Sequence, residues 1–325
     1  MVRFGILGAS LMGRTHAESI RRMPGVQLTA VADLSFDKAK SLAESMGAVP
    51  LADPNALIAS DRVDAVIIAT PTPFHFSQAK AALEHGKHVF VELPMVRRTG
   101  EGEQLLQLVK LHNRIVTVHH TQRYFLEYQL IRKKIMQGAV GKPGVIRLSR
   151  RTPHPFGWYS NFESSGGVIL DAMIHEFDYL LWCFGPVKKI FCKGLHGRRS
   201  TEQLDYALAL VRLENGAIAH IESSWCHYGQ FVLEVEIAGD EGLIRFNNQD
   251  SIPLEISILD KQSGGRRYFS ESPVLRPASF YLLEGFVRAV EGKGTSPVPV
   301  EEGLAAVRLA EAAIQSVENK RPVEL

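Results

Sequence analysis

The chain has 325 residues, of which 45% are hydrophobic and 22% charged, so an intrinsically disordered or fibrous protein is excluded. Its length predicts two domains of about 100–200 residues each. The formal net charge of +2 provides no electrostatic basis for binding nucleic acid or an anionic membrane, and no apolar run approaches the ~20 residues of a membrane span. Cys183, Cys192 and Cys226 are scattered without metal-ligand spacing, which indicates reduced thiols in a cytoplasmic protein.

Short apolar runs alternate with amphipathic stretches over the first 120 residues. The runs predict strands at Val2–Leu7, Leu28–Ala32, Ala65–Ala69, Val89–Val91 and Ile115–Val118. The stretches predict helices at Met12–Arg22, Ser35–Ser45, Phe76–Glu84 and Gly100–Leu111. Near-continuous apolar strands that alternate with helices indicate a parallel, doubly wound α/β sheet covered on both faces. Ligands of such sheets bind at the carboxyl ends of the strands.

The pattern changes after about residue 120. Longer strands are predicted at Val145–Arg150, Lys189–Leu195, Tyr206–Leu213, Ile218–Ser224, Leu233–Ala238 and Leu243–Phe246. Helices are predicted at Leu126–Gln137, Asp171–Phe184 and Leu304–Glu318. Consecutive strands without intervening helices indicate a mixed, mostly antiparallel sheet, and Glu214–Gly216 is typical of a hairpin turn. We therefore expect one domain at residues 1–121 and a second at 122–325.

A glycine-spaced turn, Gly8–Gly13, joins the first predicted strand to the first helix. The first glycine permits the tight turn, the last lets helix and strand approach, and the helix N-terminus offers free N–H groups to a pyrophosphate. Serine replaces the middle glycine of the dinucleotide fingerprint, so either its Cβ shifts the cofactor or its hydroxyl donates to a phosphate oxygen. A plain strand–helix turn gives the same pattern. The candidate phosphate-binding residues are Gly8, Ser10, Leu11 and Met12.

An acidic residue, Asp33, ends the second predicted strand 25 residues after Gly8. This is close to the ~20 residues expected for the acid that binds the ribose hydroxyls of a dinucleotide. A carboxylate there accepts hydrogen bonds from NAD and repels the 2′-phosphate of NADP, so NAD is the predicted cofactor. The alternative is a cap for the helix that begins near Ser35.

Three further motifs occur in a fixed order along the chain. They are Ala69-Thr70-Pro71 with His75, Gly86–Pro94 ending in Glu92-Leu93-Pro94, and Gly166–Asp171 with His175 and Asp178. Together with the glycine turn they resemble the glucose–fructose oxidoreductase, inositol dehydrogenase and rhizopine catabolism family over essentially the whole chain. The resemblance implies a Rossmann domain, a second domain with an open mixed sheet, NAD or NADP, and a sugar, cyclitol or related substrate. It also implies homodimers or homotetramers formed through the sheet, and further cofactor contacts from Thr70, Pro71, His75, Glu92 and Leu93.

Oxidation of a secondary alcohol requires a hydride acceptor and a base for the hydroxyl proton. On a helix Asp171 and His175 project from one face, and Asp178 continues that stripe. A carboxylate beside an imidazole holds its tautomer, so His175 is the candidate acid/base and Asp171 either orients it or contacts substrate. The residues alone favour a helix-terminal acid and a core histidine that caps a turn, and the resemblance reverses this preference toward catalysis. With no further ligand cluster visible, no metal site is expected.

Position 93 departs from the family pattern. The resemblance implies a lysine there that assists proton transfer, whereas Leu93 neither donates, accepts nor carries charge. Acid–base help of this kind is typically worth ~10²–10⁴ in rate. Three interpretations remain open. The chain is an NAD-dependent oxidoreductase in which His175 acts alone, an NAD-dependent glycosidase or lyase that works through transient oxidation, or a non-catalytic sensor of NAD and sugar.

Two residues are candidate substrate contacts. The resemblance places Arg123 in the cleft, although an ion pair at the domain joint explains it equally well. Trp158 lies in the aromatic and glycine-rich stretch His154–Tyr159, which is suited to stacking on sugars. Packing in the core or in a dimer explains this stretch at least as well.

Overall fold

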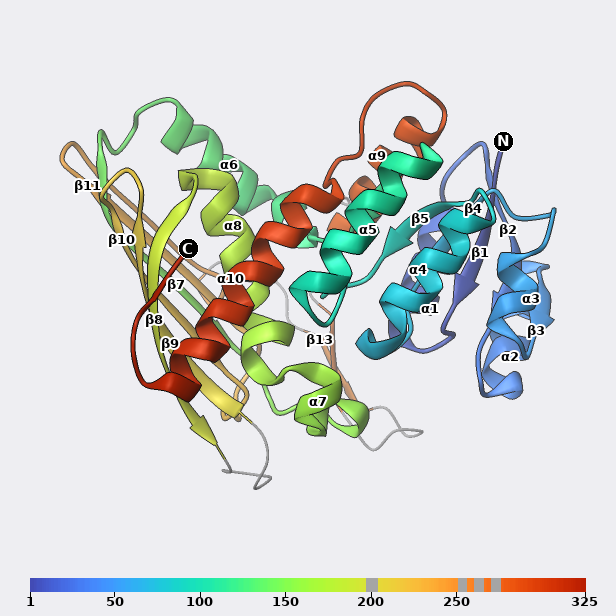
Figure 1. Ribbon diagram of the computed structural model, residues 1–325, viewed down its shortest axis with the longest axis horizontal. Helices are drawn as coiled ribbons and strands as arrows, with labels where there is room; N and C mark the ends of the chain where they lie inside the picture. Colours follow the sequence, from blue (N-terminus) through green and yellow to red (C-terminus); the bar gives the residue numbers. More distant parts are fainter. Residues whose placement is uncertain (197–203, 251–255, 260–265, 270–275) are drawn as a thin grey trace.

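The computed structural model describes residues 1–196, 204–250, 256–259, 266–269 and 276–325, with the backbone alone in 256–259 and 266–269. Two sheets lie apart from each other, with helices between and around them (Figure 1). No helix in the described part of the chain is long and apolar enough to cross a membrane.

The N-terminal sheet has six parallel strands in the order β3-β2-β1-β4-β5-β6. They are β1 (Val2–Leu7), β2 (Val26–Ala32), β3 (Val49–Leu51), β4 (Ala65–Ile68), β5 (His88–Val91) and β6 (Val116–Val118). This order is that of a doubly wound dinucleotide-binding sheet, with its reversal between β1 and β4. Every residue of β4 is fully buried, as a central strand covered on both faces requires.

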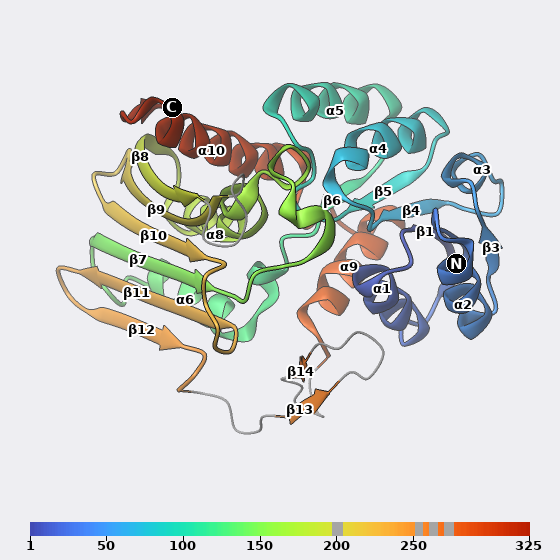
Figure 2. The same ribbon diagram turned by 90° about the horizontal axis from the view of Figure 1, so that it is seen from below.

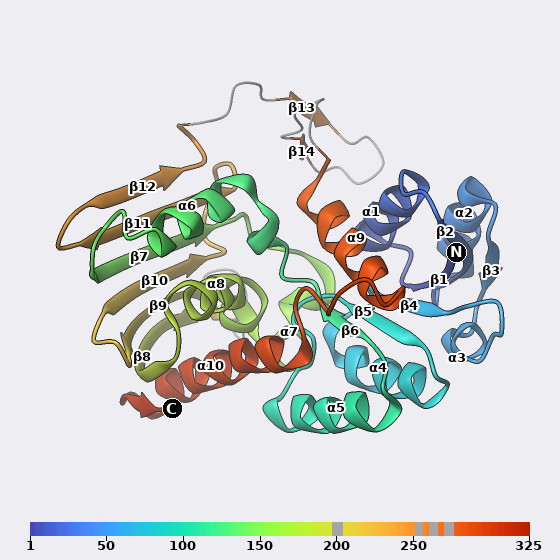
Figure 3. The ribbon, with the colours of Figure 1, turned by 90° about the horizontal axis from the view of Figure 1, so that it is seen from above.

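Helices cover both faces of this sheet (Figures 2 and 3). One face carries α1 (Leu11–Arg21) and α2 (Phe36–Met46). The other carries α3 (Pro54–Ile58), α4 (His75–Glu84) and α5 (Thr99–His112). The five predicted strands and four predicted helices of this region are confirmed, with ends that differ by no more than two residues. The sequence pattern missed β3 and α3 because elements this short show no periodicity.

The second sheet is mixed and has the order β12-β11-β7-β10-β9-β8-β15. Only β7 and β10 run parallel, and every other neighbouring pair is antiparallel. Its strands are β7 (Pro143–Arg151), β8 (Val187–His196), β9 (Leu204–Leu213), β10 (Ile218–Ser224), β11 (Val232–Gly239), β12 (Leu243–Asn247) and β15 (Val323–Glu324). The predicted α/β fold class with a large mixed sheet is confirmed. A separate pair, β13 (Ile256–Leu259) and β14 (Arg266–Phe269), forms a two-stranded ribbon.

The helices of the second domain lie on the side of this sheet that faces the first domain (Figure 1). They are α6 (Leu126–Met136), α7 (Phe162–Ser165), α8 (Ile174–Phe184) and α10 (Val300–Asn319). The opposite face of the sheet is left open by the described residues (Figure 1). The sheet is therefore buried on one side only.

Two predicted helices differ from the structure at their starts: α10 begins at Val300 instead of Leu304, and the helix predicted at Asp171–Phe184 begins differently as well. The pattern predicted a regular helix from Asp171, but Ile169–Met173 forms a π-helical turn and α8 begins at Ile174. A π-helical turn is wider than an α-helical one, so it alters the face from which Asp171 projects. Such turns are frequent at functional sites.

The end of the chain returns to the N-terminal sheet. Helix α9 (Ala278–Val290) packs against α1 and β5, and its Phe286 ring lies 6.1 Å from Phe4 and 5.5 Å from Phe90 between ring centroids. Helix α10 contacts α5, α8 and β8, so it spans the joint between the two sheets. The expected domain boundary between residues 121 and 122 thus assigns α9 to the second domain, although this helix covers the first sheet.

Candidate active site at the carboxyl edge of the parallel sheet

The glycine turn has the geometry that a dinucleotide cradle requires. Gly8 has φ +94°, a backbone conformation that side chains disfavour, and a Cβ there would lie 2.4 Å from the Ala69 carbonyl oxygen. A Cβ on Gly13 would lie 1.9 Å from the Gly8 carbonyl oxygen. Both glycines are therefore required for the close approach of β1, α1 and β4, and the turn fits the pyrophosphate of a dinucleotide.

The remaining residues of the turn begin helix α1. Ser10 is its N-cap with φ −81°, so this position needs no glycine, and its side chain is exposed and makes no capping bond. Leu11 is 69% exposed at the first helical position, and Met12 is half-buried beside it. The backbone N–H groups at this end of α1 lack intrahelical partners and are suited to a phosphate. The Ser10 hydroxyl is available to join them.

Asp33 ties the glycine turn to the end of β2. Its Oδ2 accepts a hydrogen bond from the Ala9 N–H at 2.7 Å, and its Oδ1 accepts one from the Ser35 N–H at 2.8 Å. It therefore stabilises the start of α2 through Ser35, as one alternative expected. Because an ionised carboxylate offers about four acceptor sites, lone pairs remain for ribose hydroxyls.

His75 is buried between two loops at the carboxyl edge. Its Nδ1 lies 2.8 Å from the Pro94 carbonyl oxygen and its Nε2 lies 2.7 Å from the Thr70 carbonyl oxygen. Pro71 precedes a 3-10 turn, Thr72–Phe74, that leads into His75. The imidazole thus connects the loop after β4 to the loop after β5, and we interpret His75 as a residue that positions these loops.

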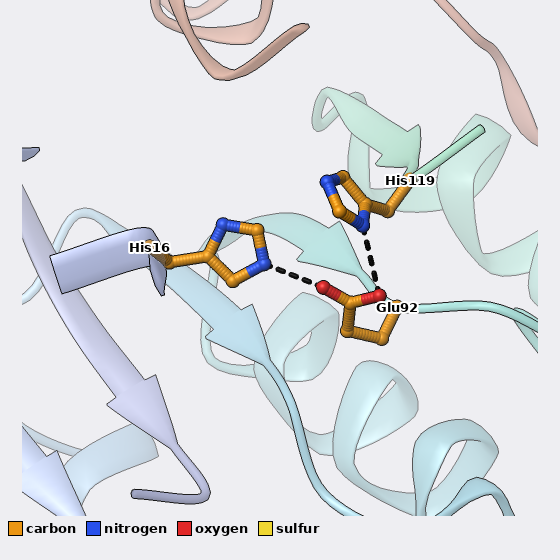
Figure 4. Close-up of side chains that lie close together, drawn as sticks. All are labelled: His16, Glu92 and His119. Atoms are coloured by element: carbon orange, nitrogen blue, oxygen red, sulfur yellow. Dashed lines mark hydrogen bonds and ion pairs between the residues drawn. The ribbon is translucent and has the colours of Figure 1, made fainter. Parts of the chain in front are cut away.

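Glu92 is the centre of a buried cluster with two histidines (Figure 4). His16 on α1 and His119 after β6 point at its two oxygens, with Nε2 to Oε1 2.5 Å and Nδ1 to Oε2 2.8 Å. Burial favours the protonated acid, but the charges and hydrogen bonds of His119 and His16 outweigh it and lower the pKa of Glu92 well below its usual range. Burial lowers the pKa of His16 in spite of Glu92. The cluster is therefore an ionised carboxylate held by two imidazole N–H groups.

The ligating atoms of these three residues all lie within 4.8 Å of one another, a spacing that a bound metal ion also requires. The sequence did not predict this cluster, because its members come from three separate elements. In the structure each Glu92 oxygen already accepts a hydrogen bond from an imidazole nitrogen. These separations are those of hydrogen bonds, and we interpret the cluster as a hydrogen-bonded one.

Asp171 and His175 belong to the second domain and lie where it meets the first. Burial raises the pKa of Asp171 to about 7, although the Arg150 guanidinium opposes the shift. Burial and the positive charge of Arg150 lower the pKa of His175 well below its usual value. The two side chains form no hydrogen bond with each other in the described part of the chain, and Asp171 lies in the π-helical turn that precedes α8. His175 is thus a neutral imidazole at neutral pH, with a buried Nδ1 that has no partner among the described residues.

Asp178 was expected to continue the line of polar side chains formed by Asp171 and His175, but its carboxylate is paired within the protein. It is 1% exposed and accepts hydrogen bonds from Arg123, with Nε to Oδ2 2.8 Å and Nη2 to Oδ1 2.5 Å. Arg123 also pairs with Glu302 at the start of α10 and lies over the Trp182 ring. This is the ion pair at the joint that the sequence left open as an alternative, so we assign Arg123 a structural role.

Trp158 lies in a 3-10 turn, Gly157–Ser160, beside the joint. Its ring stacks on Tyr159 with centroids 4.0 Å apart, and it is half-buried. Burial and then the negative charges of Asp171 and Glu92 raise the pKa of Tyr159, so this turn lies close to both acids. Trp158 is therefore near the polar groups of the site, as a substrate contact requires.

Sequence reasoning did not single out His119, His120 or Arg150. The two histidines directly follow β6, and the pair His119-His120 at the carboxyl end of a parallel strand is the signal that could have found them. Burial lowers the pKa of His120 to about 4, even though Asp178 lies 3.5 Å from its Nδ1. Arg150 is buried in an ion pair with Glu176 and only its charge reaches the site.

A doubly wound parallel sheet, a glycine cradle and a polar joint to a second sheet define a dinucleotide-binding protein of two domains. Residues 2–120 match the model of an oxidoreductase family with an NAD-binding Rossmann fold, and residues 128–245 match the GFO/IDH/MocA C-terminal domain. The chain belongs to the GFO/IDH/MocA family of oxidoreductases.

Relatives over the full length support this assignment. The chain is 26% identical to myo-inositol 2-dehydrogenase of Thermotoga maritima, covering 100% of this chain and 98% of the relative. It is 27% identical to scyllo-inositol 2-dehydrogenase (NAD(+)) of Bacillus subtilis, covering 100% and 96%. Its fold is that of GenD2 from gentamicin A biosynthesis, solved in complex with NAD, with a TM-score of 0.90, 23% identity and coverage of 100% and 96%.

Proposed function

We propose that this protein is an NAD-dependent dehydrogenase that oxidises a secondary alcohol of a sugar, cyclitol or related polyol, with His175 as acid/base. The observation that carries the proposal is the arrangement of polar groups where the two domains meet. His175 lies within electrostatic reach of Glu92 and His119, so neutral and charged proton-transfer groups of both domains meet where the parallel strands end. NAD, when bound, supplies the hydride acceptor. The cyclitol substrates in the names of the two inositol dehydrogenase relatives support the substrate class.

The chain's own residues would divide the work as follows. The glycine turn and Asp33 hold the dinucleotide, and His75 fixes the two loops beside it. His175 is neutral and accepts the hydroxyl proton during oxidation, or returns it during reduction. Asp171, with a pKa of about 7, donates or accepts a hydrogen bond to a neighbouring hydroxyl of the polyol.

A preference for NAD over NADP follows from Asp33. An ionised carboxylate repels the 2′-phosphate of NADP and accepts from the two hydroxyls of NAD. Nicotinamide fluorescence on cofactor-free protein should show much tighter binding of NADH than of NADPH. The variant Asp33→Ala should reduce this difference in affinity. Equal affinities in the unaltered protein would contradict this assignment.

His175→Ala tests the catalytic assignment. Because a positioned acid/base contributes about 10²–10⁴-fold, turnover of NAD with a responsive polyol should fall by that order while NADH affinity stays nearly unchanged. The matched control is His85→Ala, since His85 lies exposed at the end of α4 and should not affect turnover. Turnover in His175→Ala equal to that of the unaltered protein would remove His175 from the mechanism.

Because Leu93 stands where the family pattern has a lysine, we consider two other functions for the same site. A glycosidase or lyase that oxidises its substrate only transiently would retain NAD during purification and show no net change in nicotinamide absorbance during turnover. A sensor would bind NAD and a sugar without chemistry. A polyol screen that follows both NADH absorbance and product formation separates the three, because only the dehydrogenase accumulates NADH.

A further inference from the structure

We propose that Arg150 is a positioning residue of the candidate active site. Glu176 and Gln122 hold its guanidinium behind α8. From there its fixed positive charge acts on the two polar side chains of the second domain, His175 and Asp171. The inference rests on the proposed dehydrogenase function and deepens it, because it identifies the group that sets the electrostatic environment of the proposed acid/base.

Arg150 occupies a position of β7 where the alternation of the strand favours an apolar residue. The strand buries every second side chain along this stretch, first Ile146, then Leu148 and then Arg150. Arginine is almost never fully buried unless it is paired, yet Arg150 is only 7% exposed. A residue that breaks a local rule in this way is typical of a functional site.

Two partners hold the Arg150 guanidinium in one place. Its Nε donates to both carboxyl oxygens of Glu176 at 3.0 Å, and its Nη2 donates to Oε1 of Gln122. Glu176 lies on α8 and Gln122 lies in the 3-10 turn Thr121–Tyr124 after β6, and both residues are 1% exposed. Because a guanidinium is a planar, rigid fork, bonds on two of its nitrogens fix the position of its charge.

This arrangement places the charge close to the proposed acid/base. Glu176 directly follows His175 on α8, and α8 packs against β7. Arg150 and Glu176 are buried, whereas His175 and Asp171 are half-buried and therefore remain partly accessible. In the described part of the chain no hydrogen bond or ion pair joins Arg150 to either of these two, so it acts on them through space.

Arg150 is the charged group that acts on both residues. At Asp171, burial raises the pKa to about 7 and the Arg150 charge opposes the shift. At His175, burial lowers the pKa and the Arg150 charge lowers it further. The two effects have the same sign, because a nearby cation favours the loss of a proton from either group. His175 is thereby kept ready to accept the hydroxyl proton of a substrate.

The other groups that face His175 come from the ends of β5 and β6. His120 and His119 also lower its pKa, and Glu92 opposes them. Arg150 contributes the largest of these charge effects. It is also a group that does not lose its charge within the pH range in which enzymes work.

The groups that face Asp171 and Arg150 belong to the second domain and to the turn after β6. Burial raises the pKa of Tyr159, and the negative charge of Asp171 raises it further. Burial also raises the pKa of Glu176, although Arg150 and a hydrogen bond from Gln122 oppose this shift. Glu176 is therefore less readily ionised than an exposed glutamate and is a weak counter-charge to Arg150.

A paired substitution tests the charge without leaving a buried group unpaired. Arg150→Met alone would leave Glu176 in the core without its partner and destabilise the fold, so it is combined with Glu176→Gln. The titration of His175 is followed by exchange of its Cε1 proton for deuterium, measured by mass spectrometry on a peptide with no other histidine. We expect His175 of the double variant to titrate at higher pH than in the unaltered protein. The matched control is Arg308→Met with Glu103→Gln, an exposed pair between α10 and α5, which should leave this titration unchanged.

Arg150→Lys separates the charge from the shape of the side chain. A lysine keeps the positive charge but lacks the planar fork that joins Glu176 to Gln122. We expect His175 of this variant to titrate as in the unaltered protein. A shift as large as that of the double variant would show that the shape and not the charge matters, and would contradict the inference.

The pH profile of turnover provides a second readout. Because His175 must be neutral to accept a proton, the acidic limb of kcat/KM for polyol oxidation should move to higher pH in the double variant. Circular dichroism should stay unchanged. A merely structural role would lower kcat alike at every pH and leave the limb in place.

Three outcomes distinguish the inference from the proposed function. An unchanged titration of His175 in the double variant, or a titration of His175 in the unaltered protein at or above the ordinary value of 6.5, would overturn the inference. If the titration shifts as expected but no polyol reduces NAD, the dehydrogenase function fails while the action of Arg150 on His175 is still shown. If a polyol reduces NAD but neither the titration nor the acidic limb moves, only the inference fails.

Discussion

At the scale of single residues, burial decides the chemistry of this site more than sequence spacing does. The spacing of Asp171 and His175 predicted a carboxylate–imidazole pair, but the hydrogen-bonded pair in the structure is Glu92 and His119. Glu92 was expected at the cofactor, whereas the sequence pattern did not single out His119. Side chains from neighbouring strand ends meet in space although they are far apart in sequence, so no local sequence pattern predicts their contact.

Asp171 gives a stability prediction with a defined pH window. Below 3.8, the ordinary value, its carboxyl is protonated in both the folded and the unfolded chain. Between 3.8 and about 7 the unfolded chain releases the proton while the folded chain keeps it, so the free energy of unfolding decreases as pH rises. At about 1.4 kcal/mol for each pKa unit, the loss is on the order of 2–4 kcal/mol and is complete above pH ~8.

Asp171→Asn removes this penalty. Thermal unfolding should show the variant several degrees more stable than the unaltered protein at pH 8, and no more stable at pH 4. Asp37→Asn, at an exposed position on α2, is the matched control and should show no such pH-dependent gain. A stability difference for Asp171→Asn that does not change with pH would disprove the burial argument.

At the scale of elements, regular periodicity predicted strands and helices well, and local exceptions were missed. The glycine turn was predicted with its reason, since Gly8 and Gly13 lie where a side chain would collide with backbone. The π-helical turn at Ile169–Met173 was missed because its residues fit an ordinary helix pattern. The short β3 and α3 were missed because three to five residues carry no periodic signal.

Gly13→Ala tests the close approach of α1 to β1. The new Cβ would lie 1.9 Å from a backbone oxygen, so the turn must shift, and both stability and NADH affinity should decrease markedly. The matched control is Gly100→Ala in α5, where nothing lies within 4 Å of the new Cβ. Because alanine is about 0.5–1 kcal/mol better than glycine in a helix, this control should be neutral or slightly stabilising, with full NADH binding. NADH titration and thermal unfolding of both variants measure the difference.

At the scale of the whole molecule, the open face of the second sheet is the feature that a single chain does not explain. Helices cover one face (Figure 1), and Leu208 and Leu210 of β9 are 38% and 42% exposed. The residues that alternate with them along β9, Ala207, Ala209 and Val211, are buried. Apolar side chains in line on an exposed sheet face favour contact with a second copy of the chain.

We therefore predict a homodimer or homotetramer formed through this face. Size-exclusion chromatography with light scattering should give a multiple of the single-chain mass, and the double variant Leu208→Glu with Leu210→Glu should give the single-chain mass. Leu111→Glu, at an exposed position on α5, is the control and should leave the oligomer intact. A monomer in the unaltered protein at micromolar concentration would contradict the prediction.

The sequence by itself determined the class of fold, the glycine cradle and the family, because these depend on local periodicity, on backbone conformations that only glycine tolerates, and on motifs in a fixed order. Tertiary structure decided which of the predicted polar residues meet. It placed Arg123 and Asp178 in a buried ion pair, and it brought His16 and His119 to Glu92 from separate elements. The physical reason is that burial and hydrogen bonding set the charge of each group, and both arise only when distant segments pack together.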